Sequence, residues 1–323
     1  MSKIDTPTKK FMNDNNNAAD IINFMLYDGK QIIDPDELVS VDPTMIFTND
    51  KENRDSDDDT QRIRDVYKKL AMCKSDGERI YAMIGIENQT KVHYAMPVRC
   101  AVYDALSYLK QVEYTANNTR RSFFAKNDRL LPVITFVIHF SPDEWDGKTT
   151  LKELLKNTDP KLLPFISDYK MNLIDIAQLT ENDFSKFHSE TKQIFEFIKY
   201  SKNDDELQKI LTTDDGFKTL SRDAAIVIKA CTNLDLEIDK EEINMCEAIK
   251  KIQDKAILKG REEGRKEGRE EGFESGIIHG SRVEKYKTVE RAIKKNLDIS
   301  IALSVAGLTE EEYEEMKNKY KDL

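Results

Sequence analysis

Long hydrophobic runs are missing from this chain. The longest, "LLPVITFVIHF", is about half of the ~20 residues that a membrane-spanning helix needs. The opening "MSKIDTPTKK" has no apolar segment of the kind that a secretory signal carries. These two absences predict a cytoplasmic protein without a membrane partner.

Cysteine is also scarce. The chain has four cysteines, with no CxxC pair and no Cys/His cluster among them, so a structural zinc site is not expected. Scattered cysteines are typical of a reducing compartment, and we interpret these as ordinary buried thiols. They are Cys73, Cys100, Cys231 and Cys246.

Positive charge is scarce overall but concentrated in one part of the chain. The net charge of −10 argues against a simple nucleic-acid-binding protein. Residues 61–140, however, hold thirteen Lys or Arg and seven Asp or Glu, a net charge of +6, so the remainder carries −16. This local excess is either a phosphate-binding surface on an acidic protein or an ordinary fluctuation.

The hydrophobic pattern of residues 17–145 predicts an α/β core. A short helix over residues 18–27, ended by Gly29, comes first. Two strands, "RIRDVYKKLAM" and "ERIYAMIGIEN", follow around a Ser-Asp-Gly turn. A helix from Pro97 to Gln111 and the strand "LLPVITFVIHF" complete the order strand, strand, helix, strand, which is typical of an α/β fold.

The segments around this core have different expected structures. Residues 1–16 are polar and predicted to be flexible, and residues 49–60 predict a solvated acidic loop rather than a metal site. Residues 146–258 predict a helical domain. Residues 259–281 hold glycines four residues apart, which predicts either a helix that packs on another chain or a mobile tether. The glycines are Gly260, Gly264, Gly268, Gly272, Gly276 and Gly280.

Residues 282–323 predict a small helical tail. In "DISIALSVAGLTEEEYEEM", Gly307 would end one helix, and Thr309 with Glu312 would form the capping box of the next. A second helix that reads DNA should offer basic and amide groups, but this one is rich in glutamate. We therefore expect a packing or dimerisation element, and such an element would form a homo-oligomer through the C-terminal helices.

The two predicted strands would bring two acids together. If the hairpin is centred on Asp76, the numbers of paired residues add up to 152, so Asp65 lies opposite Glu87 on one face. Gln89 follows two residues later on the same face. Two carboxylates this close repel each other unless a cation lies between them, and Mg²⁺, or Mn²⁺ in its place, prefers such oxygen ligands. Taken singly, Asp65 could be a surface aspartate and Glu87 a strand-end acid, and a slip in register would separate them.

The helix after this hairpin is predicted to present a basic and aromatic face. Arg99, Tyr103 and Lys110 fall within about 40° of one another on a helical wheel. A face of this kind beside an acidic metal pair suits the phosphodiester backbone of DNA, although a solvated amphipathic face would have the same pattern. The opposite face, predicted to be the core side, consists of Val98, Ala101, Val102, Ala105 and Leu109.

Several stretches resemble one family. "RIRDVYKK", "GIENQTKVHYAMPVRCAVYDALSY", "LLPVITFVIHFSPDEWDG" and the tail "GREEGRKEGREEG" are similar to the Rpn family. This family contains recombination-promoting nucleases and transposase-like proteins of the PD-(D/E)XK nuclease superfamily. The resemblance covers most of the chain. It implies a restriction-endonuclease-like core, in which helices flank a mixed sheet, followed by an all-helical C-terminal extension.

The resemblance also implies roles for individual residues. Asp65 would be the motif aspartate and Glu87 the second metal-binding acid, with Asp20 on the first helix as a weaker candidate for an additional acid. Gln89 stands where the superfamily pattern has lysine. A neutral amide can orient a water molecule but supplies no positive charge. The expected activity is Mg²⁺-dependent DNA cleavage linked to recombination or mobile elements; the alternatives are a catalytically weak DNA-binding or assembly protein and a protein-interaction scaffold.

Overall fold

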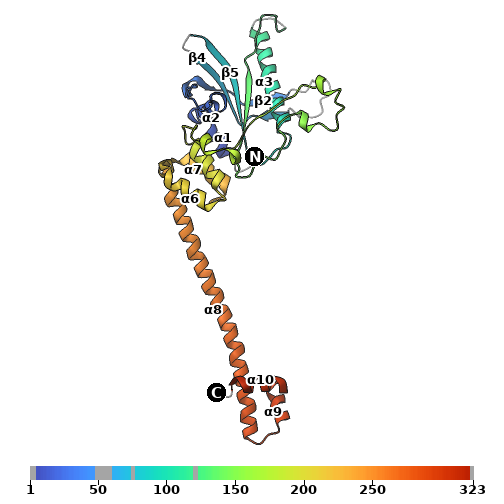
Figure 1. Cartoon of the computed structure of the whole chain (residues 1–323), viewed down its shortest axis with the longest axis vertical. Coiled ribbons are helices and arrows are strands. Elements are labelled where there is room, and N and C mark those ends of the chain that lie inside the picture. The colour runs from blue at the N-terminus through green and yellow to red at the C-terminus, as the bar shows by residue number, and fades with distance from the viewer. Residues whose placement is uncertain (1–4, 48–59, 74–76, 119–122, 321–323) are drawn as a thin grey trace. The chain divides into compact units, whose positions relative to one another are not determined.

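The protein divides into two compact units, residues 1–250 and residues 251–323. Figure 1 labels the helices and strands of this computed structural model. Within the described part of the chain, no helix combines the length and the apolar character that crossing a membrane requires. The residues that the structure describes are 5–47, 60–73, 77–118 and 123–320.

A five-stranded mixed sheet forms the centre of the first unit (Figure 1). Its strand order is β1-β4-β5-β6-β7, in which β1, β4 and β5 are antiparallel neighbours and β6 and β7 continue parallel to β5. The sheet confirms the predicted α/β class with a mixed sheet. The strands are β1 (Leu38–Ser40), β4 (Val66–Cys73), β5 (Arg79–Gln89), β6 (Val133–His139) and β7 (Asn172–Asp175).

Helices cover both faces of this sheet. The predicted helix is α3 (Met96–Asn118), which packs on the face that carries Tyr67 and Met83. Lys68 faces the other way and donates a hydrogen bond to the carbonyl oxygen of Asn13, at the end of α1. The helices of this unit are α1 (Asp5–Asn13), α2 (Asn15–Tyr27), α3, α4 (Glu181–Phe184), α5 (Thr191–Tyr200), α6 (Asp204–Thr213) and α7 (Arg222–Thr232).

Short elements complete the first unit. Two small antiparallel pairs join β2 (Thr44–Phe47) with β3 (Thr60–Ile63) and β8 (Leu220–Ser221) with β9 (Glu242–Ile243). Single turns of 3₁₀ helix connect the larger elements. They lie at Pro35–Glu37, Lys152–Leu154, Leu163–Phe165, Ile176–Gln178 and Asp215–Lys218.

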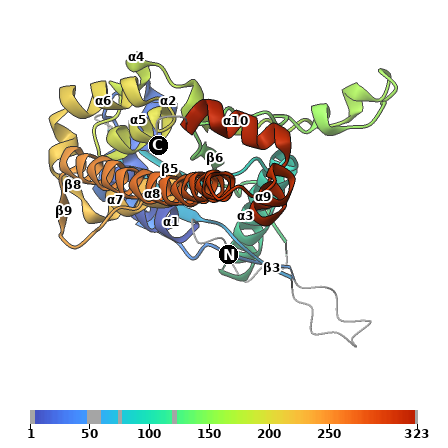
Figure 2. The ribbon, with the colours of Figure 1, turned by 90° about the horizontal axis from the view of Figure 1, so that it is seen from below.

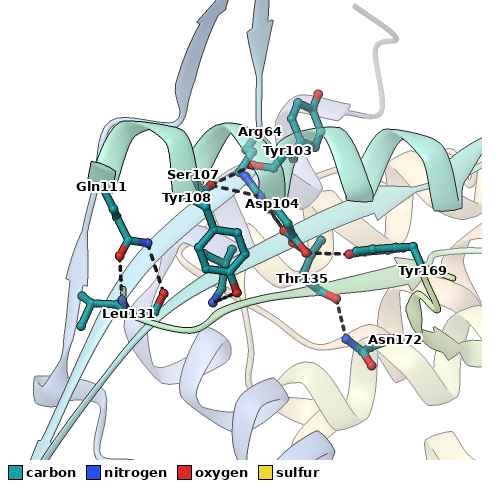
Figure 3. Close-up of polar contacts among 11 residues, drawn as sticks. Arg64, Tyr103, Asp104, Ser107, Tyr108, Gln111, Leu131, Thr135, Tyr169 and Asn172 are labelled. Atoms are coloured by element: carbon teal, nitrogen blue, oxygen red, sulfur yellow. Dashed lines mark hydrogen bonds and ion pairs between the residues drawn. The ribbon is translucent and has the colours of Figure 1, made fainter. Parts of the chain in front are cut away.

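The layer between the sheet and α3 is built around a buried arginine. Arg64 is fully buried; its Nη2 donates to Asp104 Oδ1 at 2.8 Å and its Nη1 to Thr135 Oγ1 at 2.7 Å (Figure 3). The hydroxyl of Tyr169 donates to the other oxygen of Asp104 at 2.7 Å. Gly85 leaves room for the guanidinium group, because a Cβ atom there would lie 2.0 Å from Arg64 Nη1. Burial of this charge is tolerated because it is paired and hydrogen-bonded.

Two predicted boundaries are wrong. Residues 5–13, expected to be flexible, form α1, because Phe11 and Met12 are buried in the core. The division between residues 145 and 146 does not exist, because β7 pairs with β6 and extends the sheet beyond it. A four-residue strand is too short to stand out from the surrounding helical pattern. The predicted acidic loop, apart from Thr60 at its end, lies outside the described residues.

The second unit is helical, as predicted for the C-terminal extension. It contains most of α8 (Met245–Lys294), followed by α9 (Ile299–Ala306) and α10 (Glu310–Tyr320). Both short helices pack against the end of α8 (Figure 2), with Tyr286, Leu303 and Tyr313 in the shared cluster.

The helix ends of this tail are as predicted. Gly307 ends α9 at φ +60°, a left-handed conformation that suits glycine. The Thr309 N–H donates to Glu312 Oε2 at 2.9 Å, and the Glu312 N–H donates to Thr309 Oγ1 at 3.2 Å, which completes the capping box.

The glycine-rich stretch is part of a continuous helix. Residues 259–281 lie within α8, and their side chains are exposed. A Cβ atom added at any of the six glycines would meet no atom within 4 Å among the described residues. The glycine stripe is therefore an open helix face.

Candidate functional site

The register of the central hairpin brings the two predicted acids together. Val66 pairs with Ile86, so Asp65, one residue before β4, faces Glu87 as the arithmetic of the turn predicts. An oxygen of Asp65, Oδ2, accepts a hydrogen bond from the Asn88 N–H at 2.9 Å. This bond fixes the Asp65 carboxylate beside the last residues of β5.

Glu87 is a buried acid with an incomplete set of partners. Its side chain is fully buried, and Oε2 accepts a hydrogen bond from Arg99 Nη2 at 3.1 Å. The other oxygen, Oε1, is buried and has no hydrogen-bond partner in the part of the chain that the structure describes. Burial, and then the charge of Asp65, raise the pKa of Glu87 to about 8, although Arg99 opposes the shift.

Arg99 on α3 contacts this acidic pair, and Tyr103 holds Arg99 in place. Arg99 Nε donates to the Tyr103 hydroxyl at 3.3 Å, and its guanidinium carbon lies 5.4 Å from the centre of the ring. The Arg64 guanidinium approaches the same ring at 5.0 Å. Two cations near one aromatic face are each stabilised by the ring electrons. Burial raises the pKa of the Tyr103 hydroxyl, which keeps it protonated.

The predicted orientation of α3 is wrong. Tyr103 is only 3% exposed, whereas Val98 and Leu109, assigned to the core side, are 41% and 51% exposed. A helical wheel assumes that the apolar side faces the core. Here the sheet offers Glu87, which attracts Arg99 inward, and it offers space beside Arg64 for an aromatic ring.

An opening of about 440 Å³ leads to Asp65. Lys9 and Tyr67 line it together with Asp65, and Lys9 Nζ lies 3.7 Å from Asp65 Oδ1. No sequence pattern identifies Lys9 as a site residue, because it lies in the stretch predicted to be flexible. Only the packing of α1 against the sheet brings this lysine to the acidic pair.

Two predicted site residues make contacts away from the pair. Gln89 is half-buried, and its amide Nε2 donates to the backbone oxygen of Asn88 at 3.0 Å. Lys110, about three turns beyond Arg99 on α3, is exposed and donates to the backbone oxygen of Thr44. Gln89, which the sequence resemblance assigns to the lysine position of a nuclease pattern, therefore makes a local contact with its own strand.

Asp20 has a structural contact instead of a place beside the pair. Its carboxylate accepts hydrogen bonds from the His188 N–H at 3.0 Å and from the Ser189 N–H at 2.9 Å. The Ser189 hydroxyl adds a third bond at 2.7 Å. Asp20 thereby anchors the turn before α5 to α2, which is a capping role.

The donor set of the pair fits a hard divalent cation. Two carboxylates lie side by side, and one buried oxygen lacks a partner. Among the residues that the structure describes, no group of three or more His, Cys, Asp or Glu side chains is placed to hold a metal. Mg²⁺ is commonly bound by one or two carboxylates with water at its other positions, and the number of acids in the pair matches this pattern.

The fold and this site define a class: an α/β protein with a mixed sheet and a carboxylate pair at the end of its central hairpin. Residues 3–224 match the family model described as "Putative transposase, YhgA-like". The chain belongs to this family, which confirms the resemblance found in its sequence and links it to mobile elements. Comparisons with curated proteins and with solved structures give no match.

Proposed function

We propose that this protein is a metal-dependent DNA endonuclease that hydrolyses phosphodiester bonds during transposition or recombination. The observation that carries the proposal is the Asp65–Glu87 pair. A buried oxygen of Glu87 lacks a partner among the described residues, and burial together with the neighbouring acid Asp65 raises the pKa of Glu87. A divalent cation with oxygen ligands would relieve both costs.

Two residues of the site would bind the metal ion, and two others would orient water or supply positive charge. Asp65 and Glu87 would hold Mg²⁺ or Mn²⁺. Such an ion, when bound, lowers the pKa of a coordinated water and polarises the scissile phosphate. Gln89 can orient a water molecule through its amide but adds no charge. Lys9, 3.7 Å from Asp65, supplies a positive charge at the same place and can stabilise charge that develops on the phosphate.

Ionisation of Glu87 limits metal binding. With its pKa raised to about 8, this acid is mostly protonated at neutral pH until a cation binds. A metal ion must displace the proton, so its affinity rises with pH up to the pKa. We expect cleavage at limiting Mg²⁺ to increase from about pH 6 to about pH 8 for this reason.

The proposed contacts with DNA lie on α3. The Arg99 side chain is 27% exposed beside Glu87, and Lys110 is exposed further along the helix. Both can contact backbone phosphates, which are the dominant source of DNA affinity. Tyr103, in contrast, is buried, so its role would be to hold Arg99 in position through the ring and the hydroxyl.

A catalytically weak DNA-binding or protein-assembly scaffold is the second candidate. The observation in its favour is the local hydrogen bond of Gln89 to Asn88, which turns the amide to its own strand. Arg99 also satisfies one oxygen of Glu87 without any metal. Under this alternative the protein would retain DNA without cutting it.

Cleavage of supercoiled plasmid tests the proposal. The purified protein is incubated with Mg²⁺, Mn²⁺ or EDTA beside Asp65→Asn and Glu87→Gln, which preserve side-chain shape. Asp235→Asn, at an exposed position of the same unit, is the matched control. We expect nicking or linearisation that requires metal, persists in the control and is lost in both site variants. Equal cleavage by the site variants would reject the proposal, and retention of DNA without cleavage would favour the alternative.

A further inference from the structure

A second groove lies beside the candidate site on the α3 side of the sheet. It has a volume of about 540 Å³, within the roughly 300–1,000 Å³ of small-ligand sites. Val41 and Tyr67 line both this groove and the opening that leads to Asp65. The groove, called the Tyr114 groove after the exposed ring at its edge, is therefore a direct neighbour of the opening that leads to Asp65.

The lining of the Tyr114 groove combines an apolar floor with an exposed aromatic ring. Tyr67, Met83 and Leu131 contribute apolar surface. Tyr114 lines the same groove and is 71% exposed. A flat apolar floor beside a tyrosine ring suits a nucleobase, because every base offers a face for stacking.

Cations surround this apolar floor. Lys69, Lys110 and Arg129 line the groove and are exposed. Their hydrogen bonds and ring contact involve neutral groups: the ring of Tyr81, 5.4 Å from Lys69 Nζ, and backbone oxygens for the other two. Lys110 also interacts electrostatically with Asp42. The charges of Lys69 and Arg129 are consequently available to phosphates, and that of Lys110 is shared with Asp42. Against these three cations, the described lining contains one acid, Asp42, which accepts a hydrogen bond from the Thr44 N–H at 2.9 Å.

The wall of the groove is held in place before any ligand binds. Gln111 on α3 makes two hydrogen bonds with the backbone of Leu131: Nε2 donates to the carbonyl oxygen at 3.2 Å, and Oε1 accepts from the N–H at 2.7 Å (Figure 3). The Val133 N–H donates to the Tyr108 hydroxyl at 3.0 Å. A preformed wall reduces the entropy lost on binding.

We propose that the Tyr114 groove binds an unpaired base of single-stranded DNA whose phosphates contact Lys69, Lys110 and Arg129. A base inside a duplex is stacked on both faces and cannot enter a groove of this kind without leaving the helix. The protein accordingly prefers DNA that is single-stranded beside the cleavage position. The identity of the ligand as DNA rests on the proposed function; the apolar floor and its basic rim do not.

Binding in EDTA separates this inference from cleavage. Fluorescence anisotropy is measured with a labelled single strand, long enough for a site of about 4–16 nucleotides, and with the corresponding duplex. Tyr114→Ala should weaken binding of the single strand about 5- to 10-fold, the low end for loss of one base–aromatic stack, and leave the duplex unchanged. Tyr114→Phe should bind as the parent protein does. Phe273→Ala is the matched control, because Phe273 is also 71% exposed.

The cations give a second readout. The triple variant Lys69→Ala/Lys110→Ala/Arg129→Ala should reduce the slope of log affinity against log salt by about 2 for the single strand, at roughly 0.7 per phosphate contact. The corresponding control is Lys156→Ala/Lys161→Ala, at exposed positions outside the groove.

The outcomes separate the two proposals. Equal loss for single strand and duplex in Tyr114→Ala, no loss, or no binding of DNA by the parent protein would overturn the inference. Selective loss without plasmid cleavage in any metal would uphold the groove and reject the nuclease. Metal-dependent plasmid cleavage, together with unchanged binding of the single strand by Tyr114→Ala, would uphold the nuclease and reject the groove.

Discussion

Replacement of Glu87 by glutamine tests the electrostatics of the site directly. The folded protein holds a proton on Glu87 up to about pH 8, whereas the unfolded chain releases it near the ordinary value of 4.5. Between these values the folded state binds more protons, so the free energy of unfolding falls as pH rises. One pKa unit corresponds to about 1.4 kcal/mol. The parent protein should thus lose about 2–3 kcal/mol between pH 5 and pH 7 through this group alone.

Glu87→Gln removes this titration and keeps an oxygen that can accept the bond from Arg99. The variant should match the parent near pH 5 and become progressively more stable than the parent toward pH 8. The assay is urea unfolding at several pH values, followed by the fluorescence of Trp145. This residue is the only tryptophan of the chain and is buried in the first unit, so the signal reports that unit. Parallel pH profiles for the two proteins would refute the reasoning.

Glu196→Gln is the matched control for the metal. Burial raises the pKa of Glu196 to about 7, and its Oε2 atom also lacks a hydrogen-bond partner in the described structure. This variant should likewise flatten the pH profile. Mg²⁺ at ten times its dissociation constant should stabilise the parent and Glu196→Gln by about 1.4 kcal/mol at pH 8, but not Glu87→Gln. Equal stabilisation of all three proteins by Mg²⁺ would mean that the ion binds at another site.

Three further substitutions test other parts of the structure. Gly85→Ala should lower the free energy of unfolding by about 3–5 kcal/mol in urea, because the new Cβ displaces Arg64 from its buried ion pair. Asp20→Ala should cost about 1–3 kcal/mol by leaving the N–H groups before α5 without an acceptor, while plasmid cleavage at a permissive temperature should persist. Alanine at three glycines of α8 should stabilise that helix by about 0.8–1 kcal/mol per site, measured by thermal circular dichroism. These positions are Gly264, Gly268 and Gly272.

Each of these expectations has a contrary outcome. Gly85 does not have a positive φ, so backbone strain does not explain a loss of stability there; an unchanged free energy of unfolding in Gly85→Ala would mean that Arg64 moves aside. Loss of cleavage in a folded Asp20→Ala protein would return this acid to the metal site.

We propose that the parent protein self-associates through its C-terminal helices. Light scattering compares the parent protein with the variant that has alanine at Gly264, Gly268 and Gly272. If the parent is an oligomer and this variant is a monomer, the glycine stripe is the contact between copies.

The acidic pair could be predicted from sequence because it depends on local pairing. An antiparallel hairpin has one free variable, its register, and the Ser-Asp-Gly sequence signal together with the alternation of apolar residues predicts that register. Asp65 and Glu87 are neighbours as a direct consequence. The helix caps at Gly307 and Thr309 are equally local, since each involves residues within one turn.

The remainder of the site depends on contacts between distant segments. Arg64 and Asp104 are forty residues apart, and Lys9 reaches Asp65 only through the packing of α1. Periodicity identifies the core side of a helix by its apolar residues. That rule fails on α3, because Arg99 pairs with the buried acid Glu87 on the sheet. This pairing turns the helix so that apolar side chains on its opposite face are exposed to water.

The nuclease and its catalytically weak alternative both involve one physical quantity, the free-energy cost of ionising the buried Glu87 beside Asp65. In the nuclease, a cation removes this cost, so the same group must control both the pH dependence of stability without metal and the pH dependence of metal affinity. Glu87 as a purely structural partner of Arg99 would control only the first. A protein whose stability follows the predicted titration, but which gains nothing from Mg²⁺ at pH 8, would therefore keep the buried acid as an element of the fold and lose the case for metal-dependent cleavage.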